Sequence, residues 1–159
     1  MIRSFVITAM SAAALFVSTA AALAQQTGGT AVEARAMLTK AVAAVKEDKT
    51  KALDMFNKGG AGFQDRDLYV FCHSISEAKL VATGNPNRKQ DLGTDVRTGV
   101  DAAGRHFGAE IWAAYQKPEG QITEVDYLYP KPGADKTPVA KASFVTRVGD
   151  LGCGVGYYK

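Results

Sequence analysis

The sequence is poor in the residues that build metal and catalytic sites. Its 159 residues include only two histidines, two cysteines and one tryptophan. His73 and His106 stand in no H-x-x-x-H or H-E-x-x-H pattern, and the two cysteines form no C-x-x-C pair. No nucleophile, base and orienting group occur in a recognisable arrangement. The sequence therefore predicts a protein that is not an enzyme and that holds no metal or cofactor.

The chain also lacks a strong excess of charge of either sign. Lys and Arg number 19 against 16 Asp and Glu, a formal net charge of +3, which is too small to indicate nucleic-acid binding. The composition, 47% hydrophobic and 22% charged, is that of an ordinary globular protein, and the length suits one domain.

One apolar stretch, at the N-terminus, stands apart. Arg3 precedes the apolar residues Phe5 to Val17, and the small triplet Ala22-Leu23-Ala24 follows. This order predicts a cleavable signal peptide over residues 1–24. The alternative, a permanent membrane anchor, needs about 20 apolar residues, more than this stretch supplies. We expect a periplasmic or secreted protein.

The two cysteines fit an oxidising compartment. Cys72 and Cys153 are the only cysteines, and an even pair in an exported protein more often forms a disulfide than a metal site. Two buried, unpaired thiols are the alternative that spacing alone leaves open.

Three helices are predicted from caps and apolar spacing. Thr30 and Glu33 form a capping-box pattern before an apolar stripe that ends near Glu47. A second helix spans about Thr50 to Asn57 and is closed by Gly59 and Gly60. The third spans Ala102 to Gln116, and we assign its aromatic residues to the core.

Period-two segments predict strands at Leu68 to Ile75, Leu80 to Thr83, Gln121 to Tyr129, Val139 to Val148 and Leu151 to Tyr158. The segment Gly84 to Gly99 is predicted as a loop with one brief helical turn. The mixed charges of the stretch from Arg88 to Arg105 favour a solvated loop over a basic rim. The fold class is therefore α+β, with a long N-terminal helix and an antiparallel sheet of about five strands.

If the first and last strands are neighbours, Cys72 and Cys153 can face each other across them. Alternation then places Tyr69, Phe71, His73 and Ile75 on one sheet face beside Gly152, Gly154 and Gly156. These glycines either leave room for a pocket, or let another segment pack close, or mark bulges.

A pocket on that face would have Phe71 and His73 in its wall and polar groups from Tyr127, Tyr129 and Lys141. Each residue has a plainer interpretation. Lys141 is alternatively a solvated strand lysine, and His73 a half-buried histidine satisfied by the protein itself. Trp112 belongs to the core stripe of its helix and is the member of that stripe that could cover the pocket.

Several segments resemble the single Cache domain family, type 2. The most specific is Val125 to Gly133, with its Tyr-Pro-Lys-Pro-Gly run, followed by Pro138 to Lys141, Ser143 to Val145 and Gly154 to Tyr158. The strand around Tyr69 to Cys72, the Gly84-Asn85-Pro86 turn and the helix Phe107 to Gln116 occur in the order typical of that family. The resemblance covers about residues 31–159, so we expect one Cache domain over residues 30–159.

The resemblance implies a PAS-like fold in which one sheet face holds a small organic ligand, often a small carboxylate. It places Tyr127, Tyr129 and Lys141 near that ligand. Two departures stand out, because the family often has Tyr at the position of Phe144 and commonly Trp around Leu151 to Cys153.

Receptors of this family continue into a transmembrane helix, whereas this sequence stops at Lys159. We therefore expect a free-standing binding module of sensor type that acts through a membrane-bound receptor or histidine kinase. The alternative is a protein-interaction module with a vestigial pocket that regulates such a partner. The sequence is also compatible with a homodimer.

Overall fold

The computed structural model describes residues 28–159, so the predicted signal peptide at residues 1–24 lies outside the described residues. No helix within 28–159 has the length and apolar character needed to cross a membrane.

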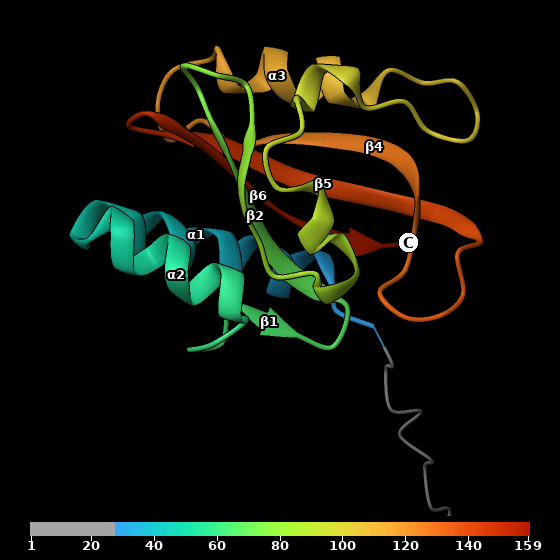
Figure 1. Cartoon of the computed structure of the whole chain (residues 1–159), viewed down its shortest axis with the longest axis horizontal. Helices are drawn as coiled ribbons and strands as arrows, with labels where there is room; N and C mark the ends of the chain where they lie inside the picture. Colours follow the sequence, from blue (N-terminus) through green and yellow to red (C-terminus); the bar gives the residue numbers. More distant parts are fainter. Residues whose placement is uncertain (1–27) are drawn as a thin grey trace, which may run out of the picture.

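Two helices cover one face of a sheet, and a third covers the other face (Figure 1). Helices α1 (Ala31–Glu47) and α2 (Lys49–Lys58) come first, followed by strands β1 (Gln64–Asp65), β2 (Leu68–Ser74) and β3 (Leu80–Thr83). Two 3₁₀ helices, η1 (Pro86–Asp91) and η2 (Val96–Thr98), lead to helix α3 (Phe107–Tyr115). Strands β4 (Thr123–Pro130), β5 (Pro138–Val148) and β6 (Leu151–Tyr158) complete the chain.

The predicted ends of α1 and α2 are confirmed. The Thr30 hydroxyl accepts the Glu33 backbone N–H, and the Glu33 carboxylate accepts the Thr30 N–H, which completes the capping box. Gly59 closes α2 with a φ of 67°, a left-handed conformation that glycine adopts at little cost.

The third helix is shorter than predicted, because its first turn is replaced by a loop. The Asp101 carboxylate accepts the backbone N–H groups of Ala103 and Arg105, and Gly104 has a φ of 83°. These features close a turn outside the helix, so α3 begins at Phe107. The segment 84–99 likewise contains two short 3₁₀ helices where one helical turn was expected.

The sheet is antiparallel, with the order β1-β2-β6-β5-β4 and with β3 paired to β2. It has six strands, one more than predicted, because the two-residue β1 is too short to give a periodic signal. Cys72 faces Cys153 in the β2–β6 register, and the two form a disulfide. The first and last long strands are thus neighbours, which was the condition stated for Cys72 to face Cys153.

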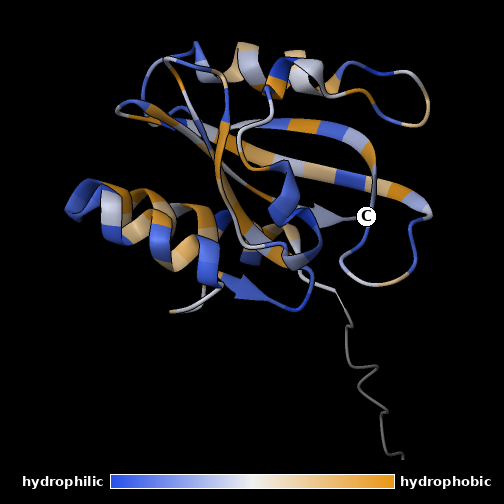
Figure 2. Cartoon of the chain, viewed as in Figure 1, coloured by the Kyte–Doolittle hydropathy of each residue, from blue (hydrophilic) through white to orange (hydrophobic). Residues whose placement is uncertain are grey.

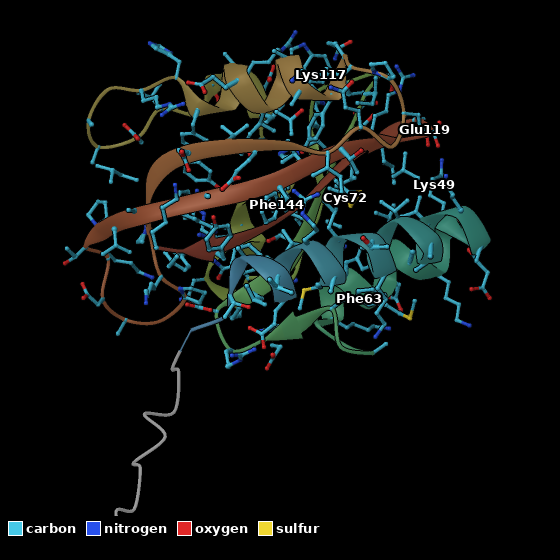
Figure 3. The ribbon with its side chains drawn as sticks, turned by 180° about the vertical axis from the view of Figure 1, so that it is seen from behind. Lys49, Phe63, Cys72, Lys117, Glu119 and Phe144 are labelled. Atoms are coloured by element: carbon cyan, nitrogen blue, oxygen red, sulfur yellow. A yellow bond between two sulfur atoms is a disulfide. The ribbon has the colours of Figure 1, made fainter. Side chains whose placement is uncertain are left out.

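The two sheet faces bury separate cores. Figure 2 shows hydrophobic residues both in the long strands and on the helices, while β1 is hydrophilic. One core joins α1 and α2 to the sheet face that carries the disulfide, and Figure 3 shows Cys72 and Phe144 on the side of the sheet that faces α1. The second core lies on the opposite face, under α3 and the loops, and contains the candidate site.

Candidate functional site

A cavity of about 500 Å³ opens between the second face of the sheet and the segment from η1 to α3. Strand β2 contributes alternate residues to its wall, and β4 contributes consecutive residues near its end. The loop from η1 to α3 supplies most of the remaining wall. The strand and α3 residues in the wall are Tyr69, Phe71, His73, Leu80, Thr83, Phe107, Ile111, Tyr127, Leu128, Tyr129, Pro130 and Pro138.

Aromatic rings make the middle of the cavity apolar. The Phe107 ring stacks on Tyr127 with 4.4 Å between centroids and an interplanar angle of 9°. Tyr129 meets the Tyr127 ring edge-on at 5.7 Å. A ligand with an apolar body would therefore contact aromatic rings, the typical lining of a small-molecule site.

The three glycines of β6 let side chains pack directly on the strand. A Cβ at Gly152 would lie 2.4 Å from the Tyr115 ring, one at Gly154 would lie 2.5 Å from Phe71, and one at Gly156 would lie 2.3 Å from the Lys141 chain. The sequence analysis gave three interpretations of these glycines, and the one that holds is the close packing of other side chains against the strand. The cavity lies above those side chains and not on the glycines themselves.

Lys141 is buried at 1% exposure, so the interpretation as a solvated lysine is wrong. Its Nζ donates a hydrogen bond of 2.7 Å to Tyr69 Oη and lies 4.4 to 4.9 Å from the ring centroids of Tyr69, Tyr129 and Tyr158. Loss of hydration lowers the pKa of Lys141 to about 7, an effect that Asp67 opposes and Arg88 reinforces. The ammonium lies behind Tyr69 and Tyr129, which themselves face the cavity.

Arg88 is a cation of the cavity wall that the sequence interpretation placed in a solvated loop. Its guanidinium lies 5.3 Å from the Tyr129 ring centroid and forms an ion pair with Asp91. The loop from η1 to α3 thus faces the cavity as well as water, which corrects the solvated-loop interpretation. Nothing in the spacing of its charges could indicate which side chains turn inward.

His73 lies in the wall at 7% exposure, and its Nδ1 is 3.1 Å from Tyr115 Oη. Burial lowers the pKa of His73 to about 4, although the charge of Asp95 acts in the opposite direction. The imidazole is therefore neutral at physiological pH. One ring nitrogen is satisfied within the protein, and the ring also borders the cavity.

Of the other predicted site residues, some lie in the cavity wall and one does not. Phe71, Tyr127 and Tyr129 line the cavity, and the Tyr127 hydroxyl lies 2.7 Å from Ser143 Oγ. Trp112 is not among the lining residues, and the Arg97 guanidinium lies 5.6 Å from its ring centroid. Tyr69 is a wall residue that the sequence analysis placed on the correct sheet face but did not choose.

Comparisons with known proteins identify similar folds. No protein-family model matches the chain, and no curated protein matches it in sequence. A periplasmic sensor domain of a chemotaxis protein is 24% identical, with a TM-score of 0.59 over 78% of this chain and 86% of that one. A methyl-accepting chemotaxis protein from Vibrio parahaemolyticus is 20% identical, with a TM-score of 0.62 over 80% of this chain and 86% of the other.

A third structure is a Cache chemosensory domain that recognises carboxylic acids. It is 21% identical, with a TM-score of 0.57 over 77% of this chain and 84% of that chain. The chain therefore has the α+β fold of Cache-type chemosensory domains, as the sequence predicted.

Proposed function

We propose that this chain is an exported sensor module of the single Cache type that binds a small organic carboxylate. Residues 30–159 would form the binding domain, after a signal peptide at 1–24. The disulfide and the likeness to periplasmic sensor domains support export. The ligand signal would pass to a membrane-bound receptor or histidine kinase, in keeping with the chemotaxis proteins that share the fold.

The observation that carries the proposal is the presence of two cations, Arg88 and Lys141, at one end of the cavity, of which Arg88 is paired with Asp91. Arg88 lies in the wall, and Lys141 lies behind Tyr69 with no ion pair to any residue within 28–159. A bound carboxylate would be stabilised by both charges and by the hydroxyl groups of Tyr69 and Tyr129. The likeness to a domain that recognises carboxylic acids agrees with this chemistry.

Thermal unfolding against a ligand panel tests the proposal. Carboxylates, amines and purines are added to the oxidised protein, and a ligand at about 100 times its dissociation constant should add about 2.7 kcal/mol. We expect stabilisation by carboxylates alone. The shift should decrease strongly in Arg88→Met and persist in the control Arg147→Met, since Arg147 lies at the β5–β6 hairpin and does not line the cavity.

No stabilisation by any carboxylate would contradict the proposal. That result, together with a co-purifying membrane receptor or kinase, would favour the alternative of a protein-interaction module with a vestigial pocket.

A further inference from the structure

The end of the cavity opposite Arg88 presents a hydrogen-bond donor. Tyr115 is fully buried, and within residues 28–159 the only hydrogen-bond partner of its hydroxyl is His73 Nδ1. A buried hydroxyl needs an acceptor for its proton, so Tyr115 donates to Nδ1. The proton of the neutral imidazole is then on Nε2, for which the described residues supply no acceptor. We assign this Nε2–H as a donor to a ligand in the cavity.

A carboxylate borders the same end. Asp95 lines the cavity and pairs in a β-bridge with Lys79, next to Leu80, which is the register partner of His73. Hydrogen bonds from Arg97 lower the pKa of Asp95 to about 2, so its side chain is ionised at physiological pH. This end therefore offers one N–H donor and one carboxylate acceptor, whose charge is paired with Arg97.

The two ends lie too far apart for a short ligand to contact both. Tyr69 and His73 point to the same side of β2 and are separated by four residues, which corresponds to about 13 Å along a strand. A two- or three-carbon acid bound at the Arg88 end would leave the His73 Nε2–H without an acceptor. The rings of Phe71, Phe107 and Tyr127 line the space between.

The far group of the ligand must both accept and donate. A second carboxylate would accept from His73 but has no proton to donate to Asp95, whose charge is already paired with Arg97. An ammonium cannot accept from Nε2–H. A hydroxyl accepts from His73 and donates to Asp95. The ring-lined, apolar middle of the cavity suits an aromatic body.

We propose, resting on the proposed function, that the ligand is a hydroxylated aromatic monocarboxylate. Its carboxylate lies toward Arg88 and Tyr69, and its hydroxyl lies between His73 and Asp95. His73 is thus the residue that determines specificity, while Arg88 supplies affinity for the acid group.

Isothermal titration of the oxidised protein tests the assignment with four probes: 4-hydroxyphenylacetate, phenylacetate, 1,4-phenylenediacetate and acetate. We expect 4-hydroxyphenylacetate to bind at least about tenfold more tightly than phenylacetate, because only the hydroxyl satisfies Nε2–H. The dicarboxylate should bind more weakly than phenylacetate. In His73→Phe the preference for the hydroxyl should fall to about one while phenylacetate affinity is kept, and His73→Gln, which retains an N–H donor, should restore part of it.

The control His106→Phe changes the exposed histidine that precedes α3 and should leave the preference unchanged. Equal affinities of the two monocarboxylates, a preference that survives in His73→Phe, or tighter binding of the dicarboxylate would overturn the inference. Binding of acetate but of none of the aromatic acids would overturn this inference and would still agree with the proposed function. Binding of no carboxylate would contradict both this inference and the proposed function. The comparison of probes on the unaltered protein decides even where His73→Phe does not fold.

Discussion

Among residues 28–159, Lys141 is the only lysine or arginine in the interior, and no carboxylate within ion-pairing distance compensates its charge. The ammonium is held instead by the Tyr69 hydroxyl and by three tyrosine ring faces. A buried cation without an anionic partner is unfavourable for folding, and a carboxylate ligand would supply the missing charge. The buried charge of Lys141 therefore lowers the stability of the protein and raises its affinity for a carboxylate ligand.

The stability of the protein should depend on pH through Lys141. Because the folded pKa of Lys141, about 7, lies below the unfolded value, the unfolded chain binds more protons between the two, and the free energy of unfolding rises with pH there. Relative to Lys141→Met, the unaltered protein should gain about 2 kcal/mol between roughly pH 7 and pH 9. Urea unfolding at both pH values measures this. Parallel pH profiles of the two proteins would show that the lysine does not titrate in this range.

The site residues that could be predicted from the sequence are those on strands. Phe71 and His73 reach the cavity because alternation along β2 determines which face each occupies, whereas β4 contributes Tyr127, Leu128 and Tyr129 in succession. Arg88 was missed, since its direction depends on a 3₁₀ helix that neither composition nor charge spacing encodes. Trp112 was considered as a cover for the cavity because it belongs to the apolar stripe of α3, but helical spacing cannot tell which stripe residue meets an opening.

At the scale of elements, β6 lies in the sheet between β2 and the pair β5 and β4. It pairs with β2 on one side and with β5 on the other, and its glycines allow Tyr115, Phe71 and Lys141 to lie directly on its backbone. The wall of the cavity therefore depends on an uninterrupted surface of small residues along this strand.

Gly154→Ala should destabilise the protein and weaken ligand binding. The new Cβ would lie 2.5 Å from Phe71 and 2.8 Å from Val145, so the Phe71 ring must move toward the cavity. Overpacking of this kind costs about 1–3 kcal/mol, measurable by urea unfolding. In the control Gly60→Ala the added methyl meets no atom within 4 Å, and stability should be nearly unchanged. Equal stability of the two variants would show that β6 tolerates side chains.

The elements themselves were largely predictable from the sequence. The period-two segments predicted the long strands that the structure contains, and the capping box at Thr30 predicted the start of α1. The start of α3 was misplaced, because the backbone contacts of Asp101 compete locally with the first helical turn. Strand β1 forms through pairing with β2 and has no pattern of its own.

At the scale of the whole molecule, the disulfide ties two strands that are far apart in sequence. Cys72 and Cys153 are 81 residues apart, and the segment between them includes the loop from η1 to α3 that closes the cavity. A bond across so long a segment restricts the unfolded chain strongly.

Removal of the disulfide should therefore lower the free energy of unfolding by about 2–4 kcal/mol. The double variant Cys72→Ala, Cys153→Ala, compared with the oxidised protein in urea, provides the measurement without a reductant. Because β2 and β6 stay paired by their backbone hydrogen bonds, the variant should still fold and bind ligand. Unchanged stability would indicate that the unfolded chain is not restricted by the bond.

The central claim, that the cavity takes a carboxylate through the charges of Arg88 and Lys141, is tested most directly by a pair of ligands equal in shape. Isothermal titration compares phenylacetate with phenylacetamide, which differs by the loss of the negative charge. The account predicts binding of the acid, at least about tenfold weaker binding of the amide, and loss of this difference in the double variant Arg88→Met, Lys141→Met. Equal affinity for the acid and the amide in the unaltered protein would contradict it.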